Sequence, residues 1–120
     1  MTTTYAILLP GDEAQWAAAS PEEQARVYRL HDEFSATLEK HGHKIVGGAE
    51  LAPSWTGKIV AGGPEEVLVT DGPYAETAEQ LGGFYLVESD DLDDLLRVCG
   101  LITEGDRIEV RPCLPPVEER

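Results

Sequence analysis

The sequence has few basic side chains and no long apolar run, and each shortage excludes a class of protein. Nine lysines and arginines stand against 23 aspartates and glutamates, which gives a formal net charge of -14. Such a surface repels phosphate backbones and anionic lipid, so we expect no nucleic-acid partner and no membrane-surface binding. No stretch approaches the roughly 20 apolar residues of a membrane span. The start, "MTTTYAILLPGDE", also lacks the features of a signal peptide. We therefore predict a cytoplasmic protein kept soluble by its acidity; a cationic substrate or partner is the alternative reading of the charge.

Recognisable metal-binding and catalytic motifs are also missing. The two cysteines, Cys99 and Cys113, have no CxxC spacing, so reduced thiols are expected. The chain has no G-x-S-x-G, no P-loop and no G-x-G-x-x-G. His41 and His43 form an H-x-H pattern, but no third ligand follows at a recognisable spacing. We therefore predict that the protein binds no metal and no cofactor.

What the chain does contain indicates one small domain. A length of 120 residues suits a single core. We assign this domain to residues 1–115 and regard 116–120 as a flexible tail. Short apolar runs that end at glycine or proline indicate strands, and apolar residues at steps of three and four indicate helices. The expected elements are a strand 4–9 that stops at Pro10-Gly11, a helix 20–42, a strand 43–51, a hairpin of strands 58–61 and 66–70, a strand 83–89, a helix 90–100 and a strand 107–112.

The longest helix has clear signals at both ends. Ser20 is a good N-cap, Pro21 suits the first helical position, and Glu23 completes a capping box. Gly42 is a natural left-handed stop. One face of this helix is expected to lie on a sheet, because mostly apolar residues recur along it at steps of three and four. That face carries Val27, His31, Phe34, Leu38 and His41.

The order of elements predicts the fold class and an assembly. An α+β chain of this order is typical of a ferredoxin-like sandwich, an antiparallel sheet with two helices on one face, here with an extra β-hairpin. The Gly47-Gly48 pair predicts a bulge or a close backbone approach in the second strand. The helices leave the other face of the sheet uncovered, and such a face needs a partner. We therefore predict a homodimer that packs through the sheet face.

His31 is the main candidate for chemistry. Its neighbours on the helix face are apolar, so its ring is expected to point toward the sheet. An imidazole placed there is a suitable general acid or base near neutral pH. Asp71, in the turn "TDGPY", is the carboxylate that we predict to orient it. The structural alternatives are a core histidine bonded to a backbone carbonyl and an aspartate that bonds only its own turn.

Three further residues are candidates for the wall of a pocket. Tyr74 and Trp55 are aromatic side chains in turn or loop regions, and Glu76 follows Tyr74 closely. Apolar walls with a few polar groups are typical of small-molecule sites. The alternative for Trp55 is a lid over the core. We predict that Tyr74, Trp55 and Glu76 bind substrate.

Two stretches carry a resemblance to a known family. "VTDGPYAETAEQLGGFYLVE" resembles the signature of the DGPF group within the YCII-related family, and "YAILLPGDEAQWAAASPEE" is similar to the start of that family. The resemblance implies a ferredoxin-like fold that assembles as a dimeric α/β barrel. It also implies an acid/base pair of a helix histidine and a nearby aspartate, which falls here on His31 and Asp71. This chain departs from the pattern at Tyr74, where phenylalanine is usual, and at Ala78, where lysine is common.

Three hypotheses about function stay open at this point. Some members of the wider family resemble enzymes that eliminate or isomerise small ring compounds. The first hypothesis is therefore an acid/base enzyme of lyase or isomerase type that acts on a small organic molecule through His31 and Asp71. Family members are often found beside sigma-factor-type regulators. The second hypothesis is accordingly a non-catalytic dimeric module that binds a small molecule or a partner and is linked to transcription regulation. In the third, the two side chains only hold the turn against the helix.

Overall fold

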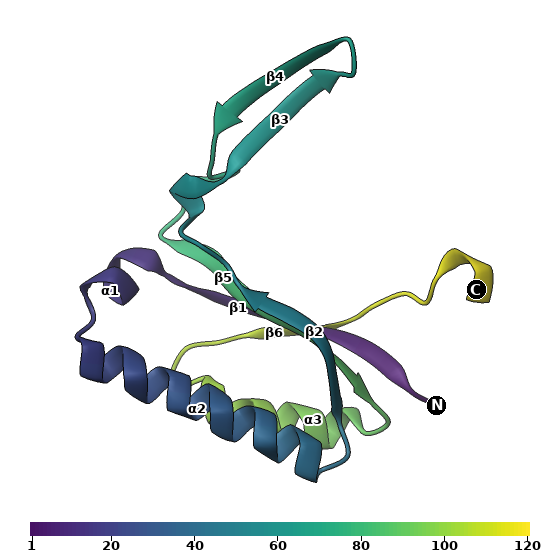
Figure 1. Ribbon diagram of the computed structural model, residues 1–120. Coiled ribbons are helices and arrows are strands. Elements are labelled where there is room, and N and C mark those ends of the chain that lie inside the picture. The colour runs from purple at the N-terminus through teal and green to yellow at the C-terminus, as the bar shows by residue number, and fades with distance from the viewer.

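The chain forms a four-stranded antiparallel sheet with helices on one face and a separate two-stranded hairpin beyond the end of the sheet (Figure 1). The computed structural model describes residues 1–120. The strands are β1 (Thr3–Asp12), β2 (Lys44–Glu50), β3 (Lys58–Gly63), β4 (Glu66–Asp71), β5 (Glu79–Ser89) and β6 (Glu109–Pro112). The helices are α1 (Glu13–Ala18), α2 (Pro21–Lys40) and α3 (Leu92–Cys99), and the short 3₁₀ turns are η1 (Ser54–Thr56), η2 (Gly100–Ile102) and η3 (Val117–Glu119). The predicted α+β class is confirmed.

Strands β1 and β5 form the centre of the sheet. The strand order is β2-β5-β1-β6, and every neighbouring pair is antiparallel. Because side chains alternate along a strand, the fully buried Ile7 points to the helices, whereas Ala6 and Leu8 lie on the opposite side. Their partners on β5, Leu86 and Phe84, share that side. We call it the outer face; α2 and α3 both lie on the other side of the sheet (Figure 1).

Helix α2 begins and ends where its local signals predict. The hydroxyl of Ser20 accepts a hydrogen bond from the backbone N–H of Glu23 at 3.1 Å, and Gly42 beyond the helix has a φ of 86°. Phe34 and Leu38 are fully buried, and each stabilises the fold by about 1.5–3 kcal/mol through burial. The second half of the predicted capping box is wrong, because the carboxylate of Glu23 binds the arginine of the next turn.

The core between the sheet and the helices is small. Its seven buried hydrophobic residues come from both layers and are Ile7, Phe34, Leu38, Val87, Leu95, Val98 and Cys99. Tyr85 of β5 packs against this cluster, with its ring centroid 5.3 Å from that of Phe34. The side chain of Tyr85 is therefore held by core packing, which fixes where its hydroxyl lies.

Strand β2 contains both predicted features, a bulge at Val46 directly before the glycine pair and a close backbone approach at Gly48. The register between β2 and β5 shifts between Ile45 and Gly47. Gly48 has a φ of 139°, and a Cβ at that position would lie 2.5 Å from the carbonyl oxygen of Phe84. Only glycine fits such an approach. The bulge thus brings β2 close to the part of β5 that carries Tyr85.

The first strand is longer than predicted. We expected it to stop at Pro10-Gly11 and to be followed by a loop, which is wrong. After a register shift between Leu9 and Pro10, β1 continues to Asp12 because these residues pair with the start of β5. Asp12 then caps helix α1 by accepting from the N–H of Gln15 at 3.1 Å. Pairing with a distant strand overrides the local stop signal.

Strands β3 and β4 form the predicted hairpin, which we call the arm (Lys58–Asp71). The arm is a sheet of its own, and it leaves the end of the main sheet on the side away from the helices (Figure 1). Its base is tied to α1, because the carboxylate of Glu13 accepts from the N–H of Ser54 at 2.6 Å and from the hydroxyl of Ser54 at 2.7 Å. These hydrogen bonds hold the base of the arm next to α1.

Candidate functional site around His31

His31 lies on the side of α2 that faces the sheet, as predicted, and it is half-buried. Its Nδ1 atom is 2.7 Å from the hydroxyl oxygen of Tyr85 on β5. The two rings are stacked, with centroids 5.9 Å apart and planes at 20°. The partner of the imidazole is therefore a phenol from the sheet, and the alternative of a backbone carbonyl partner is wrong.

Burial sets the charge of both members of this pair. Burial lowers the pKa of His31, against smaller rises from the carboxylates of Glu50 and Asp32. Burial raises the pKa of Tyr85, against a smaller lowering from the nearby side chain of Ser35. At pH 7 the site therefore holds an uncharged imidazole beside a protonated phenol.

The Nε2 atom of His31 is the ring nitrogen left for a ligand. The bond between the rings has two possible directions. If the phenol donates to Nδ1, Nε2 carries the ring hydrogen and acts as a donor. If Nδ1–H donates to the phenol oxygen, Nε2 has a free lone pair and acts as a base. Nε2 has no hydrogen-bond partner within the chain in either case.

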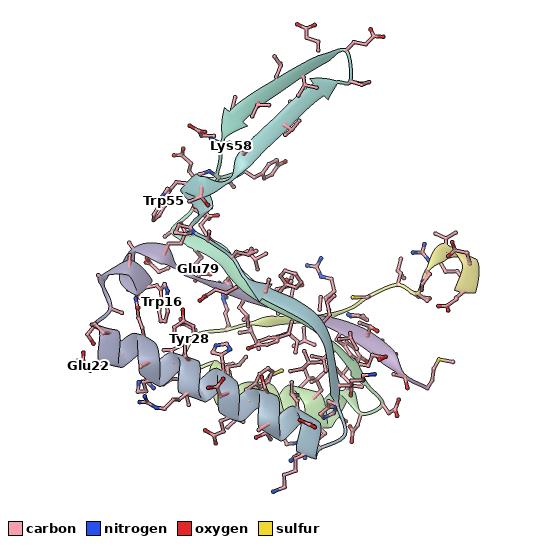
Figure 2. All side chains as sticks on the ribbon, in the orientation of Figure 1. Trp16, Glu22, Tyr28, Trp55, Lys58 and Glu79 are labelled. Atoms are coloured by element: carbon pink, nitrogen blue, oxygen red, sulfur yellow. The ribbon has the colours of Figure 1, made fainter.

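Two more aromatic side chains and a carboxylate lie beside this pair. The hydroxyl of Tyr28, one turn before His31, donates to Glu50 at 2.8 Å. That hydrogen bond raises the pKa of Tyr28, so the phenol stays protonated. The ring of Trp16 packs edge-on against Tyr28 with centroids 5.6 Å apart, and Figure 2 shows the two side chains next to each other near the start of α2. We call His31, Tyr85, Tyr28, Glu50 and Trp16 the His31 cluster.

A cavity of 620 Å³ opens between the second half of α2 and the start of β2. Its lining residues are Ser35, Ala36, Glu39, Gly42, His43, Lys44 and Ile45. It adjoins the His31 cluster through Ser35, which lies one helical turn after His31. A volume of this size suits a small organic molecule.

Asp71 lies away from the imidazole. It ends strand β4 at the base of the arm, where its exposed carboxylate binds the ammonium of Lys58. No hydrogen bond joins Asp71 to His31 within the chain, and Tyr85 occupies the position next to the ring. The predicted pairing of His31 with Asp71 is therefore absent from the single chain.

The three predicted substrate-binding residues are also on the arm side of the molecule. Trp55 is in η1 at the base of the arm and is 59% exposed (Figure 2). Tyr74 follows the arm and is 92% exposed, and Glu76 is exposed as well. None of the three belongs to the His31 cluster. Their role in binding stays a prediction.

A second polar cluster was missed by the sequence analysis. A single oxygen of Asp94 is 2.8 Å from Nε2 of His43 and 2.9 Å from Nδ1 of His41. The other ring nitrogen of His43 is 2.9 Å from the hydroxyl of the buried Ser89. Hydrogen bonds from His41 and His43 lower the pKa of Asp94. This network ties the end of α2 and the start of β2 to β5 and α3, which is a structural role.

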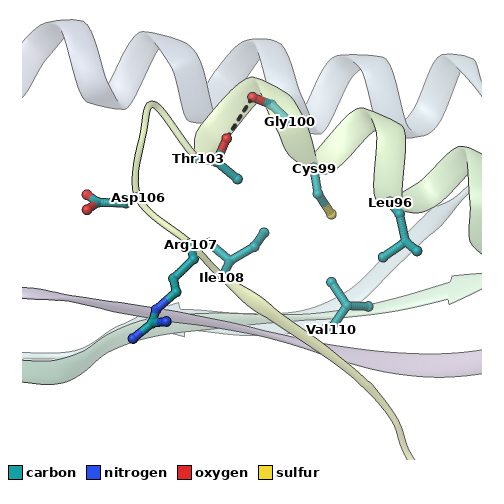
Figure 3. A pocket seen from close by; sticks show the side chains of 8 residues that line it. All are labelled: Leu96, Cys99, Gly100, Thr103, Asp106, Arg107, Ile108 and Val110. Atoms are coloured by element: carbon teal, nitrogen blue, oxygen red, sulfur yellow. Dashed lines mark hydrogen bonds between the residues drawn. The ribbon is translucent and has the colours of Figure 1, made fainter.

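The cavity under α3 is a weaker candidate for a functional site. It has a volume of 360 Å³ and lies between α3, η2 and β6 (Figure 3). Cys99 lines it, and burial raises the pKa of that thiol to about 11, so the thiol is unreactive at neutral pH. The hydroxyl of Thr103 is used within the loop, because it donates to the carbonyl of Gly100 at 3.2 Å. The protein has no group of three His, Cys, Asp or Glu side chains placed to hold a metal ion.

Fold and site together define a small α+β protein with a histidine and a tyrosine between its long helix and its sheet. Residues 3–100 match the YCII-related domain family. An uncharacterised protein of Rhizobium meliloti (strain 1021) is 39% identical over 94 residues, which is 77% of this chain and 73% of that relative. The chain belongs to the YCII-related family, as its signature predicted. None of its helices has the length and apolar character needed to cross a membrane.

Proposed function

We propose that this protein is an acid/base enzyme, of lyase or isomerase type, that acts on a small organic molecule at the His31 cluster. The observation that carries this proposal is the half-buried imidazole whose Nδ1 is held 2.7 Å from the Tyr85 hydroxyl while Nε2 has no partner. A general base must be uncharged at the working pH and held in one orientation. Burial supplies the first condition for His31, and Tyr85 supplies the second.

The chemistry needs only proton movement. Nε2 of His31 takes a proton from an acidic C–H or O–H of the substrate and returns it at another atom or to the leaving group. As positive charge develops on the ring, the bond from Nδ1 to the phenol oxygen of Tyr85 strengthens. Glu50, which faces the same ring, further stabilises the imidazolium. Trp16 and Tyr28 offer an aromatic wall for a ring compound.

The assembly that we propose is a homodimer through the outer face. The antiparallel sheet with two helices on one side agrees with a ferredoxin-like sandwich, and two such sheets packed together would form the dimeric barrel of the family. Ala6, Leu8, Phe84 and Leu86 supply partly exposed apolar side chains to the centre of the outer face, and neither α2 nor α3 covers it. Arg111 and Glu109 of β6 lie beside this centre and are paired with each other. A bare apolar face of this kind favours association in water.

Binding and turnover of small ring compounds with an acidic C–H test the enzymatic proposal. We expect His31→Gln to lower turnover by about 100-fold or more, the usual contribution of a general base. His41→Gln, a variant of an exposed histidine bonded to Asp94, is the matched control and should keep full activity. Turnover that survives in His31→Gln would contradict the proposal. A compound that binds at the cluster without any turnover would favour the binding module instead.

A further inference from the structure

The arm carries apolar side chains on both of its faces. In its ladder Val60 lies opposite Val69, and Ala61 lies opposite Leu68. Because successive residues of a strand point to opposite faces, these two pairs belong to different faces of the arm. Val60 is 66% exposed and Leu68 is 57% exposed, so the chain itself covers neither face. A two-stranded hairpin alone is marginally stable in water, and the arm therefore needs a surface to pack on.

The shape of the chain shows how much surface is uncovered. Its radius of gyration is 16.8 Å, against about 13.6 Å for a compact domain of 120 residues. Its accessible area is 8586 Å², about 2200 Å² more than a compact monomer of 13.1 kDa would expose. Standard interfaces bury roughly 800 Å² per partner, and obligate homodimers bury on the order of 1000–2500 Å² per partner. The excess area therefore falls within the range that an obligate homodimer buries on each partner.

The arm and the outer face each carry apolar side chains, and the outer face has its apolar centre on β1 and β5, flanked by Arg111 and Glu109 of β6. Both lie on the side of the sheet away from the helices, and the angle between them opens on that side (Figure 1). The charged side chains of the arm are Lys58 and Asp71 at its base and Glu65 and Glu66 at its tip. The strand residues between them, 59–63 and 67–70, carry no charge. The whole chain has a net charge of -14, so two copies repel each other at long range, and we expect the contact to be made by the apolar centre of the outer face and the uncharged strands of the arm.

We propose that the arm packs on a second copy of this chain and clasps it across the outer face. This inference rests on the proposed dimer and adds the element that holds it. In a two-fold dimer the same surface is used by both copies, so each arm holds the other subunit. The excess area, which falls in the range that an obligate homodimer buries per partner, favours a second copy over a foreign protein. Added salt should strengthen the dimer, because it screens the repulsion between two acidic chains.

Sedimentation velocity with a matched pair of variants tests the clasp. Leu68→Glu places a charge on the arm, and Leu96→Glu makes the same change on α3, where the side chain is 47% exposed. We expect Leu68→Glu to raise the dimer dissociation constant by about 100-fold or more, because a charge would be buried without a partner. Leu96→Glu should leave the constant unchanged. Equal dissociation constants for the two variants would overturn the clasp.

Two further measurements separate the clasp from the dimer itself. Leu86→Glu changes the outer face, so a dimer that is lost in Leu86→Glu but kept in Leu68→Glu would overturn the clasp while leaving the sheet-to-sheet dimer. Hydrogen exchange of the arm in the unmodified protein needs no variant. Arm amides should be at least tenfold better protected at concentrations where the dimer forms. A monomeric protein at every concentration would overturn clasp and dimer together, and the His31 assay would be unaffected.

Discussion

Gly48→Ala is the substitution whose cost follows most directly from the geometry of the site. The φ of 139° at Gly48 is a conformation that L side chains rarely adopt, and it alone costs about 1–3 kcal/mol. The new Cβ would also lie 2.5 Å from the carbonyl oxygen of Phe84 and 3.0 Å from the Cα of Tyr85. Both contacts are with backbone, so β2 or β5 must move, and overpacking of this kind costs about 1–3 kcal/mol more. We expect a total loss of about 2–6 kcal/mol.

Urea denaturation measures this loss. With a slope of about 2 kcal/mol per molar urea, the midpoint should fall by about 1–3 M. Gly11→Ala is the control, because a Cβ there meets nothing within 4 Å and its effect should stay within about 0.5 kcal/mol. Gly48 is paired with Tyr85 across the sheet, so the variant should also disturb the bond between Tyr85 and His31. Equal midpoints for the two alanine variants would refute the reasoning.

Three other predictions concern titratable groups. The pKa of Asp94 is lowered in the folded state, so its carboxylate stabilises the fold at pH values above its ordinary pKa of 3.8 and loses that effect as the pH falls through the folded-state pKa. Asp94→Asn should therefore be less stable than the wild type at neutral pH, and the difference in stability should disappear in acid. Because burial lowers the pKa of His31, the unfolded chain binds a proton more readily, and stability should fall as the pH drops below 6.5; His31→Gln should show less of this fall. Cys113, which is partly exposed, should react with a thiol reagent at pH 8 while the buried Cys99 does not; equal rates would contradict the burial of Cys99.

Features that depend on neighbouring residues were predictable from the sequence. The start of α2 at Ser20 and its end before Gly42 follow from capping, which needs only a few residues. The irregularity of β2 around Gly47-Gly48 and the hairpin of the arm follow from glycine placement and alternating strands in the same way. The extension of β1 past Pro10 did not follow, because it depends on pairing with β5.

The partners of the candidate side chains were less predictable. The apolar stripe of α2 correctly placed His31 against the sheet. It could not name Tyr85, because that contact joins residues 54 positions apart and depends on the strand order. The network of His43 with Asp94 was hidden for the same reason, since its members are 51 positions apart. Asp71 was a reasonable candidate by residue type, but the arm carries it away from the helix.

The central claim is that His31 is an uncharged base held by Tyr85, and an NMR titration of the ring tests it most directly. The protein has three histidines, so the signals of His31 are assigned by their loss in His31→Gln. We predict that His31 titrates below its ordinary pKa of 6.5 and that its Nδ1 resonance shifts in Tyr85→Phe, which removes the hydroxyl 2.7 Å away. A His31 that titrates at or above 6.5, with an Nδ1 signal unchanged in Tyr85→Phe, would contradict the account.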